Sequence, residues 1–468
     1  MRTSWSTFLP SSTPAQPIRR TPTWPGQRDS TRREALIKSG FLSLGRTWVA
    51  LSRRRRKIPA FPECTYPSNK IGIGGFSRGT PRERRRRARA LEYTLDLLLP
   101  GERKSMQPTA ARVRSARYEA MQDFITDSPW DWRETRARLL EKMADGFAGA
   151  DGQIVIDDVP LVKPATESPG VGRQYCGVTG DVRNCQVLVD AVHVRPRDGT
   201  NRGAAGFCFA LGLYLPKAWA ESPGRCREAG IPWPVIFRPK WRIGWEPLDR
   251  LRELAVPHRA VVADCGYGDG REFRAELRAR REAYVMEVTA SEARVVPAST
   301  PVLPPGERAP GARMGRRTTK AHIVPGTTTT TPQAMAAVAD DWTTVRWSKG
   351  TPGILEGPFL HRKVRACDGS LPTDEVGWLL LEDRADGLRA WICWGLNEAR
   401  LENLAAIAHR RWGIEQFHED AKRELGLDHL EARRWRGLNH HLTWVLIAHT
   451  FRVREQARVV AMDSENAK

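Results

Sequence analysis

The segment GQIVIDDVP, residues 152–160, decides the fold class that this chain predicts. Three consecutive β-branched residues, Ile154, Val155 and Ile156, are typical of a short buried strand, and the apolar run stops at Asp157 and Asp158. Two acidic residues after a strand form a turn or a cap more often than a metal site. Their meaning therefore depends on the elements that surround this strand.

The segments that follow predict an α/β fold with a mixed sheet. Residues 184–196 and 206–216 are β-rich and close together, which is consistent with an antiparallel meander. An amphipathic helix, an apolar strand, a helix and a further strand are then predicted, at 241–257, 259–264, 271–283 and 284–288. This order favours one mixed sheet covered by helices.

Three regions outside this core differ in composition. Residues 80–147 read as basic helices, interrupted at Ser128–Pro129. Residues 289–396 begin with a stretch rich in Pro, Gly and Thr and continue as strands, which predicts a β-rich insertion. From 397 the chain is predicted to be helical to about Arg454, with a break around 426–437.

The chain is strongly basic, with 75 Lys and Arg against 54 Asp and Glu and a net charge of +21. A charge of this size favours a polyanionic partner, most commonly nucleic acid. Residues 1–60 hold 13 of the basic residues and two of the acids, so much of the excess lies in an N-terminal arm that we expect to be disordered. A transit peptide or a misassigned start are alternative interpretations of this arm.

Two classes of protein are disfavoured. No apolar run approaches the roughly 20 residues that cross a bilayer, so we expect no membrane partner. The eight cysteines form no C-x-x-C pair, which argues against a zinc site and a disulfide framework. A reducing cytoplasm suits this cysteine pattern best.

The second predicted acidic strand end is at Asp264. If its strand is a parallel neighbour of the first, the terminal carboxylates meet at one edge of the sheet. Close carboxylates repel each other unless a cation neutralises them, and hard oxygen ligands at a partly open site suit Mg²⁺. Two such ions can activate an attacking oxygen and stabilise a leaving oxygen in phosphodiester displacement. A site of this kind usually needs a third carboxylate.

We expect the third carboxylate to come from the segment RRWGIEQFHEDAK, residues 410–422. Arg411, Glu415 and Lys422 recur at intervals of four and seven, which place them along one side of an α-helix. Ile414 and Phe417 belong to an apolar stripe that would dock on the sheet and leave Glu415 at the edge of the interface. Taken alone, Arg411 and Glu415 would be a weak surface ion pair.

Together these motifs resemble the DDE transposases of bacterial insertion sequences, in the branch named for a Tyr–Arg–Glu–Lys signature around the last acid. The resemblance runs from about Arg78 to Arg454. The motifs that carry it are VIDD, GRQYCG, YLPKAW, VVADCGYGD, RWSKGT and RRWGIEQFHEDAKRELGLDH. The resemblance implies an RNase H-like core with a β insertion before the last acid.

The resemblance also implies the residues of the active site. Asp158, Asp264 and Glu415 would be the catalytic acids and would bind two Mg²⁺ ions, for which Mn²⁺ could substitute. Asp157, next to the first acid, is the second choice for that position. The expected chemistry is nicking that exposes a 3′-hydroxyl at the element end, followed by attack of that hydroxyl on target DNA.

DNA contacts are expected from four residues. Arg411 and Lys422 match the Arg and Lys of the signature and would position phosphates. Trp347 and Lys349, in RWSKGT, would stack on a base or contact phosphate, although a tryptophan that packs in a strand is the simpler interpretation. The signature tyrosine is replaced by Ala408, which puts any tyrosine–phosphate contact in doubt.

The expected partners are double-stranded DNA, as terminal repeats and as target, and a second copy of the chain on that DNA. We expect the protein in the bacterial cytoplasm, associated with the nucleoid. A degenerate relative that represses transposition by binding DNA, and a resolvase or RNase H-type nuclease, are the alternatives. The expected segments are a disordered basic arm at 1–76, a helical DNA-binding domain at 77–147, the first part of the catalytic core at 148–288, the β-rich insertion at 289–396, the C-terminal helical part of the core at 397–456 and a tail at 457–468.

Overall fold

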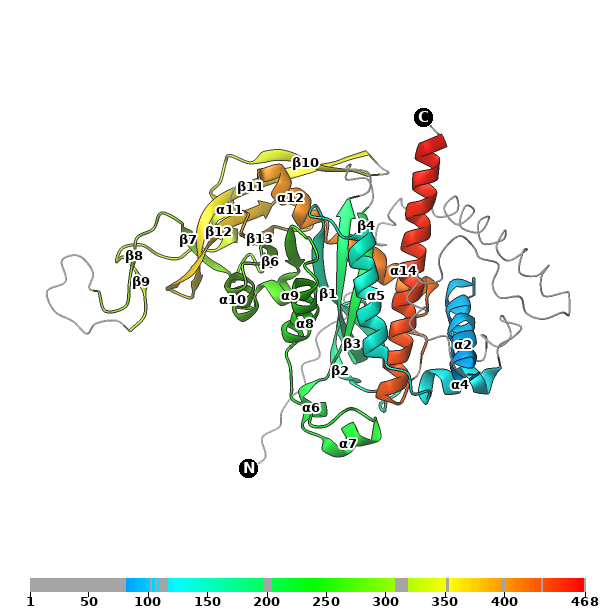
Figure 1. Cartoon of the computed structure of the whole chain (residues 1–468). Helices are drawn as coiled ribbons and strands as arrows, with labels where there is room; N and C mark the ends of the chain where they lie inside the picture. The colour runs from blue at the N-terminus through cyan, green and yellow to red at the C-terminus, as the bar shows by residue number, and fades with distance from the viewer. Residues whose placement is uncertain are drawn as a thin grey trace, which may run out of the picture. The chain divides into compact units, whose positions relative to one another are not determined.

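The computed structural model contains the mixed sheet that the sequence predicts. β1 (Gln153–Val162) pairs antiparallel with β3 (Asp181–Pro196), which pairs antiparallel with β4 (Ala204–Tyr214). β1 also pairs parallel with β5 (Ala260–Ala263), and β5 pairs parallel with β6 (Tyr284–Val288). The order β4-β3-β1-β5-β6, with helices packed on the sheet, is consistent with an RNase H-like fold (Figure 1).

The structure describes residues 81–101, 103–105, 108, 117–196, 204–307, 319–350, 353–396, 400–430 and 432–466. The predicted arm at 1–76 lies outside the described residues. Within the described ranges, no helix combines the length and the apolar character needed to span a bilayer.

Helices cover both faces of the core strands. α8 (Lys240–Glu253) lies on one face. Gly244 of α8 packs so close to the sheet that the Cβ of any other residue there would lie 3.0 Å from Ile156 Cγ2. α13 (Trp412–Glu419) lies on the other face, where a Cβ built on Gly206 would meet the carbonyl oxygen of Gly413 at 2.9 Å. Glycines in α8 and in β4 therefore allow both helices to approach the sheet closely. The remaining short helices are α6 (Lys217–Ala220), α7 (Pro223–Glu228), α9 (Cys265–Gly268), α10 (Arg271–Ala279) and α12 (Leu401–His409).

The helices that precede the sheet pack against the last helix of the chain. These elements are α2 (Pro81–Leu98), α4 (Tyr118–Thr126), α5 (Trp132–Phe147) and α14 (Trp435–Asn466). The ring of Phe124 lies 5.7 Å from that of Trp444, and Trp130 stacks on Phe124 at 5.9 Å. The N-terminal helices therefore share a hydrophobic core with α14. α14 also continues past Arg454, the predicted helix end, because residues 455–466 contain neither proline nor glycine to stop it.

The segment predicted as an insertion extends the core sheet. Its elements are β7 (Arg294–Pro297), β8 (Val302–Leu303), β9 (His322–Ile323), α11 (Pro332–Ala337), β10 (Thr343–Gly350), β11 (Gly353–Asp368), β12 (Leu371–Glu382) and β13 (Arg389–Trp394). β13 pairs antiparallel with β6 on one side and with β12 on the other. In the described part of the chain the continuous sheet has 11 strands.

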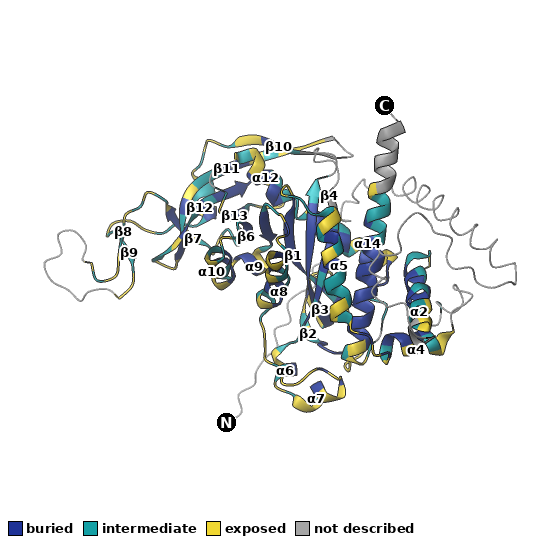
Figure 2. Cartoon of the chain, viewed as in Figure 1, coloured by how far each residue is buried: buried dark blue, intermediate teal, exposed yellow. Residues whose placement is uncertain are grey.

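The hydrophobic core follows this sheet from the RNase H-like strands into the inserted ones. Val155, Val262, Val285 and Leu380 are each fully buried. Figure 2 shows the central strands almost entirely in the colour of buried residues, while α8 and α10 expose one side. Burial on both faces explains why the strands read as continuous apolar runs and do not alternate.

Ile392 tests whether the inserted strands and the core unfold together. It is almost fully buried in β13, between Leu379 of β12 and Met286 of β6. Ile392→Ala should lower the free energy of unfolding by about 2–5 kcal/mol, because it leaves a cavity between the two parts. Urea unfolding should keep a single transition with a lower midpoint.

Val338→Ala is the control, because Val338 is 84% exposed and its loss should change stability by less than about 0.5 kcal/mol. Two separate transitions, of which only one moves in Ile392→Ala, would show that the inserted strands fold independently.

Candidate active site

Asp157 and Asp158 project to opposite faces of β1, because successive side chains of a strand alternate. Asp158 lies on the face of α8. Its Oδ2 forms an ion pair with Lys240, the first residue of α8, and its Oδ1 accepts a hydrogen bond of 2.6 Å from the Tyr267 hydroxyl. Asp158 is therefore held by one cation and one phenol.

Asp157 lies on the face of α13. Its Oδ2 accepts a hydrogen bond of 2.6 Å from Arg411 Nη1, and Arg411 Nη2 lies 3.4 Å from Glu415 Oε1. Arg411 occupies the N-terminal end of α13, directly after the chain leaves α12. The guanidinium therefore bridges the predicted third acid and the second choice for the first acid. The Glu415 side chain remains 53% exposed.

Asp264 stands at the same edge of the sheet. Ile156 of β1 pairs with Ala263 of β5, so the residues that follow them in the two parallel strands emerge side by side. The Oδ1 atom of Asp264 is buried and has no hydrogen-bond partner among the described residues. Burial raises the pKa of Asp264, Arg411 opposes the rise, and the charge of Asp158 reinforces it.

The electrostatics of Asp157 and Asp264 are linked through Arg411. Burial raises the pKa of Asp157 to about 7, although Arg411 opposes the rise; the charges of Asp264 and Asp190 add to it. Burial lowers the pKa of Arg411, but the carboxylates of Asp157, Glu415 and Asp264 outweigh burial and raise it. The carboxylates at this edge therefore require a positive charge, which Arg411 provides.

The donor chemistry of this edge suits a divalent cation. Carboxylate oxygens are the ligands that Mg²⁺ prefers, and the partnerless Oδ1 of Asp264 is an oxygen that a cation would satisfy. Among the described residues, however, no three His, Cys, Asp or Glu side chains already converge as a ligand set. The Asp264 carboxylate fits the cation, whereas Asp158 contacts Lys240 and Tyr267, and Glu415 contacts Arg411.

The helix that carries Glu415 does not continue to Lys422 as an α-helix. α13 ends at Glu419, and Asp420–Glu424 form a π turn in which the Leu425 amide bonds to the Asp420 carbonyl. The interval of seven therefore does not place Lys422 on the α-helical face expected for it. The wider turn rotates Lys422 relative to Glu415, and burial lowers the pKa of the Lys422 amine.

The two residues predicted from RWSKGT lie in β10. Trp347 stacks on His409 with 4.1 Å between ring centroids and meets Phe359 edge-on at 5.4 Å. These contacts are those of a tryptophan that packs in a strand. The side chain of Lys349 lies outside the described residues, and DNA contact by either residue stays a prediction. Ala408, at the position of the signature tyrosine, is 4% exposed.

Sequence reasoning missed four residues that contact this site. Lys240 and Tyr267 contact Asp158. Asp190 of β3 pairs with His418 of α13, between the helix and the sheet. A charged residue within the apolar run CQVLVDAVHV was a signal for Asp190, because an isolated charge is seldom buried without a partner. Lys240 and Tyr267 have no comparable sequence signal.

The fold and the acidic sheet edge define a class, the RNase H-like nucleases that act on phosphodiesters, and comparison with known proteins identifies the family. Residues 75–354, more than half of the chain, match the family described as DDE superfamily endonuclease, so the chain belongs to that family. The matched residues include Asp157, Asp158 and Asp264 and end before Glu415.

A probable transposase for insertion sequence element IS701 from Microchaete diplosiphon is 26% identical over 174 residues. That alignment covers 37% of this chain and 41% of the relative, so the chain spans about two fifths of the length of the curated relative it matches. The resemblance to DDE transposases is confirmed at the level of the family.

Asp157 predicts a distinct pH dependence of stability. Folding raises the pKa of its carboxyl from 3.8 to about 7, so the native state retains a proton that the unfolded chain releases between these values. The stability contributed by this group is present at low pH and is lost as pH rises towards and through about 7. Asp157→Asn should therefore flatten the decline of unfolding free energy across this window, measured by urea unfolding at several pH values.

Asp341→Asn is the matched control. The pKa of Asp341 is lowered by its hydrogen bond from Arg362, so this carboxyl contributes no decline in the same window. If the unfolding free energies of wild type and Asp157→Asn decline equally between about pH 4 and 7, the assignment of the proton to Asp157 is refuted.

Proposed function

We propose that this chain is a metal-dependent DNA transposase that cuts insertion-sequence ends and joins them to target DNA. One observation supports this most directly: Asp157 and Asp264 directly follow the last paired residues of the parallel strands β1 and β5, and Arg411 connects Asp157 to Glu415. Family membership places the chain among DDE endonucleases, and the relative is a probable transposase.

In this proposal Asp158, Asp264 and Glu415 are the catalytic acids. Asp158 is the more accessible of the paired aspartates, with 26% of its side chain exposed against 12% for Asp157. Asp157 would then hold Arg411, and it is the alternative first acid. Either assignment places one β1 carboxylate beside Asp264, because both aspartates interact electrostatically with it.

Mg²⁺ is the cation that these carboxylates would hold, and two ions would supply activation of the attacking oxygen and stabilisation of the leaving oxygen. The contribution of the chain is geometric. β1 and β5 fix two acids on a rigid sheet, and α13 brings the third. Lys240 and Arg411 balance the charge of the paired aspartates and leave Asp264 Oδ1 available as a ligand.

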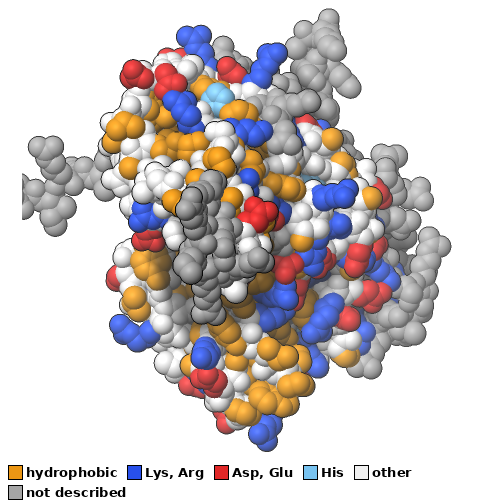
Figure 3. All heavy atoms as spheres, turned by 90° about the vertical axis from the view of Figure 1, so that its left-hand side faces the viewer, with side chains coloured by type: hydrophobic (Ala, Val, Ile, Leu, Met, Phe, Trp, Pro, Cys, Tyr) orange, Lys and Arg blue, Asp and Glu red, His pale blue; other side chains and the backbone are white. Residues whose placement is uncertain are grey.

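DNA contact is proposed for Arg411 and Lys422, which would bind phosphates on either side of Glu415. Trp347 and Lys349 are further proposed contacts from β10. On the face shown in Figure 3, Lys and Arg side chains are interspersed with acidic and hydrophobic ones. The DNA-bound form would be a homodimer that holds two element ends, in the cytoplasm at the nucleoid.

A specific observation favours a second function, repression by DNA binding without cleavage. The Arg411 guanidinium lies between Asp157 and Glu415, and Ala408 is buried where the signature has a tyrosine. A chain in which Arg411 permanently held these acids would bind element ends and leave them uncut.

Cleavage of element-end DNA separates the two functions. Purified protein, a labelled duplex of the element's terminal sequence and Mg²⁺ should yield a nicked strand with a 3′-hydroxyl. Glu415→Ala should reduce the rate about 100-fold or more, because the site loses a carboxylate that supports several kcal/mol of transition-state stabilisation. Glu419→Ala, one turn later and paired with Arg423 at 2.7 Å, should cleave normally. A shifted but uncut duplex with wild-type protein would instead support the repressor.

The same assay distinguishes the paired aspartates. Asp158→Asn should abolish nicking while DNA binding persists, because it removes a proposed ligand. Asp157→Asn should retain measurable nicking, because it removes a partner of Arg411. The reverse pattern would assign the first acid to Asp157.

A further inference from the structure

Asp190 is a carboxylate in the interior of the sheet. It lies in the middle of β3, is 0% exposed, and is directly opposite Asp157 in the antiparallel register of β1 and β3. Residues opposite each other in such a pair project to the same face. Asp190 therefore lies on the face that α13 covers. Its strand, β3, is one strand further from β5 and Asp264 than the strand of Asp157.

His418 of α13 is the partner of Asp190. Its Nε2 lies 2.9 Å from Asp190 Oδ2, while Asp190 Oδ1 is buried without a hydrogen-bond partner among the described residues. Burial lowers the pKa of His418, but the charge and hydrogen bond of Asp190 outweigh it and raise the pKa. Burial raises the pKa of Asp190, against the attraction of His418. The two groups thus form one polar contact between the sheet and α13.

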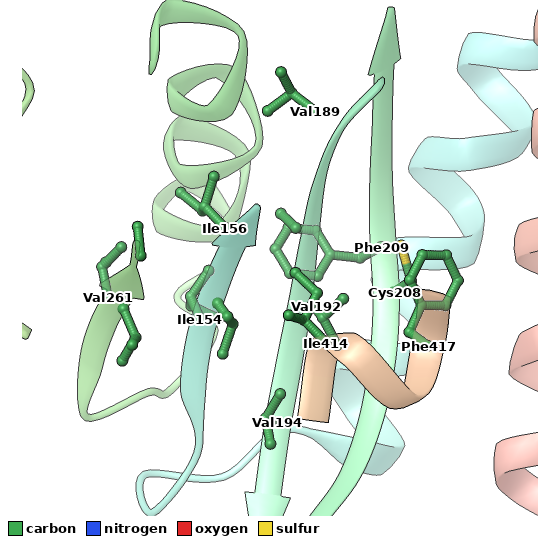
Figure 4. Close-up of a cluster of buried hydrophobic side chains, with 14 of the residues drawn as sticks. Ile154, Ile156, Val189, Val192, Val194, Cys208, Phe209, Val261, Ile414 and Phe417 are labelled. Carbon is green, nitrogen blue, oxygen red and sulfur yellow. The ribbon is translucent and has the colours of Figure 1, made fainter. Parts of the chain in front are cut away.

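α13 also makes apolar contacts with the sheet. Figure 4 shows Ile414 and Phe417 facing Val192 of β3 and Cys208 of β4. Ile414 is fully buried and Phe417 almost so. Apolar contacts set the distance between helix and sheet but restrict rotation about the helix axis weakly, because dispersion attraction is not directional. Directional contacts must set the rotation.

Two directional contacts lie on either side of Glu415. Asp157 accepts from Arg411, four residues before Glu415, and Asp190 pairs with His418, three residues after it. The two aspartates face each other across β1 and β3, so both contacts originate from one rigid part of the sheet. A buried ionic pair contributes little net stability compared with apolar packing, which makes a role in geometry the better explanation of Asp190.

We propose that Asp190 and His418 are positioning residues, whose buried pair fixes the rotation of α13 so that Glu415 is directed to the sheet edge at Asp264. This deepens the proposed function and depends on it, because it takes Glu415 as a metal ligand. Neither residue touches DNA or the reacting atoms in this proposal. Their effect is exerted through the placement of one carboxylate.

Direct Mn²⁺ binding to the full-length protein, followed by the EPR signal of the free ion, tests the proposal without DNA. Asp190→Asn and His418→Leu should each weaken Mn²⁺ binding roughly 10–100-fold, the usual effect of losing an outer partner of a metal ligand. His418→Gln should bind close to wild type, because its amide can still donate to Asp190. In a Glu415→Gln background, His418→Leu should cause no further loss, because both changes act through Glu415.

Glu375→Gln is the matched control for stability. Glu375 forms a buried ion pair with Arg274, whose Nε lies 2.9 Å from Glu375 Oε1. This variant should lower the thermal unfolding midpoint about as much as His418→Leu while Mn²⁺ binding stays at the wild-type level. If Asp190→Asn fails to fold, His418→Gln and His418→Leu alone decide the question.

The outcomes separate this inference from the function on which it rests. A wild-type chain that binds no Mn²⁺ overturns the proposed metal-dependent function, and the positioning role with it. If wild type and His418→Leu bind Mn²⁺ with the same affinity and differ only in their thermal unfolding midpoint, the positioning role is overturned and the proposed function still stands.

Discussion

The charge balance around one guanidinium connects the sheet, the helix and the candidate site. Parallel pairing of β1 with β5 ends at Ile156 and Ala263 and so brings the next residues, Asp157 and Asp264, to the same part of the sheet, where burial and mutual repulsion raise the pKa of both carboxyls. Such an edge is stable only with a positive charge against it. Arg411 supplies that charge and extends it to Glu415. The same excess of carboxylate oxygen makes the edge suitable for a divalent cation.

The placement of Arg411 depends on how the chain turns between two helices. α12 ends at His409 and α13 begins at Trp412, so Arg411 lies at a helix junction where its side chain can reach under the sheet edge. A continuous helix would have left Arg411 and Glu415 on the surface as an ordinary ion pair. The π turn after Glu419 then separates Lys422 from this cluster. One short segment thus serves helix docking and charge balance in turn.

The inserted strands make the site part of a larger sheet. Because β13 pairs with β6, and β6 pairs with β5, the inserted strands are connected through β6 to the strands that position the aspartates. His409, at the end of α12, stacks on Trp347 of β10 and its Nε2 lies 3.0 Å from the Glu382 carboxylate of β12. The helix junction before Arg411 therefore rests on the inserted strands, which gives this layer a structural connection to Glu415.

The sequence by itself determined the element types, their order and the acids. Apolar runs such as IVI in β1 and AVVA in β5 are unambiguous because burial on both faces requires them. Asp264 follows the end of β5 as predicted, whereas the predicted strand end at Asp157 and Asp158 was wrong, because β1 continues to Val162 through its pairing with β3. The tertiary structure alone decided which of Asp157 and Asp158 faces α13, because strand alternation separates adjacent residues while sequence leaves open which helix covers which face. It also decided the Asp190–His418 contact and the π turn. The Asp190–His418 contact joins segments more than 200 residues apart, and local periodicity carries no information about such packing.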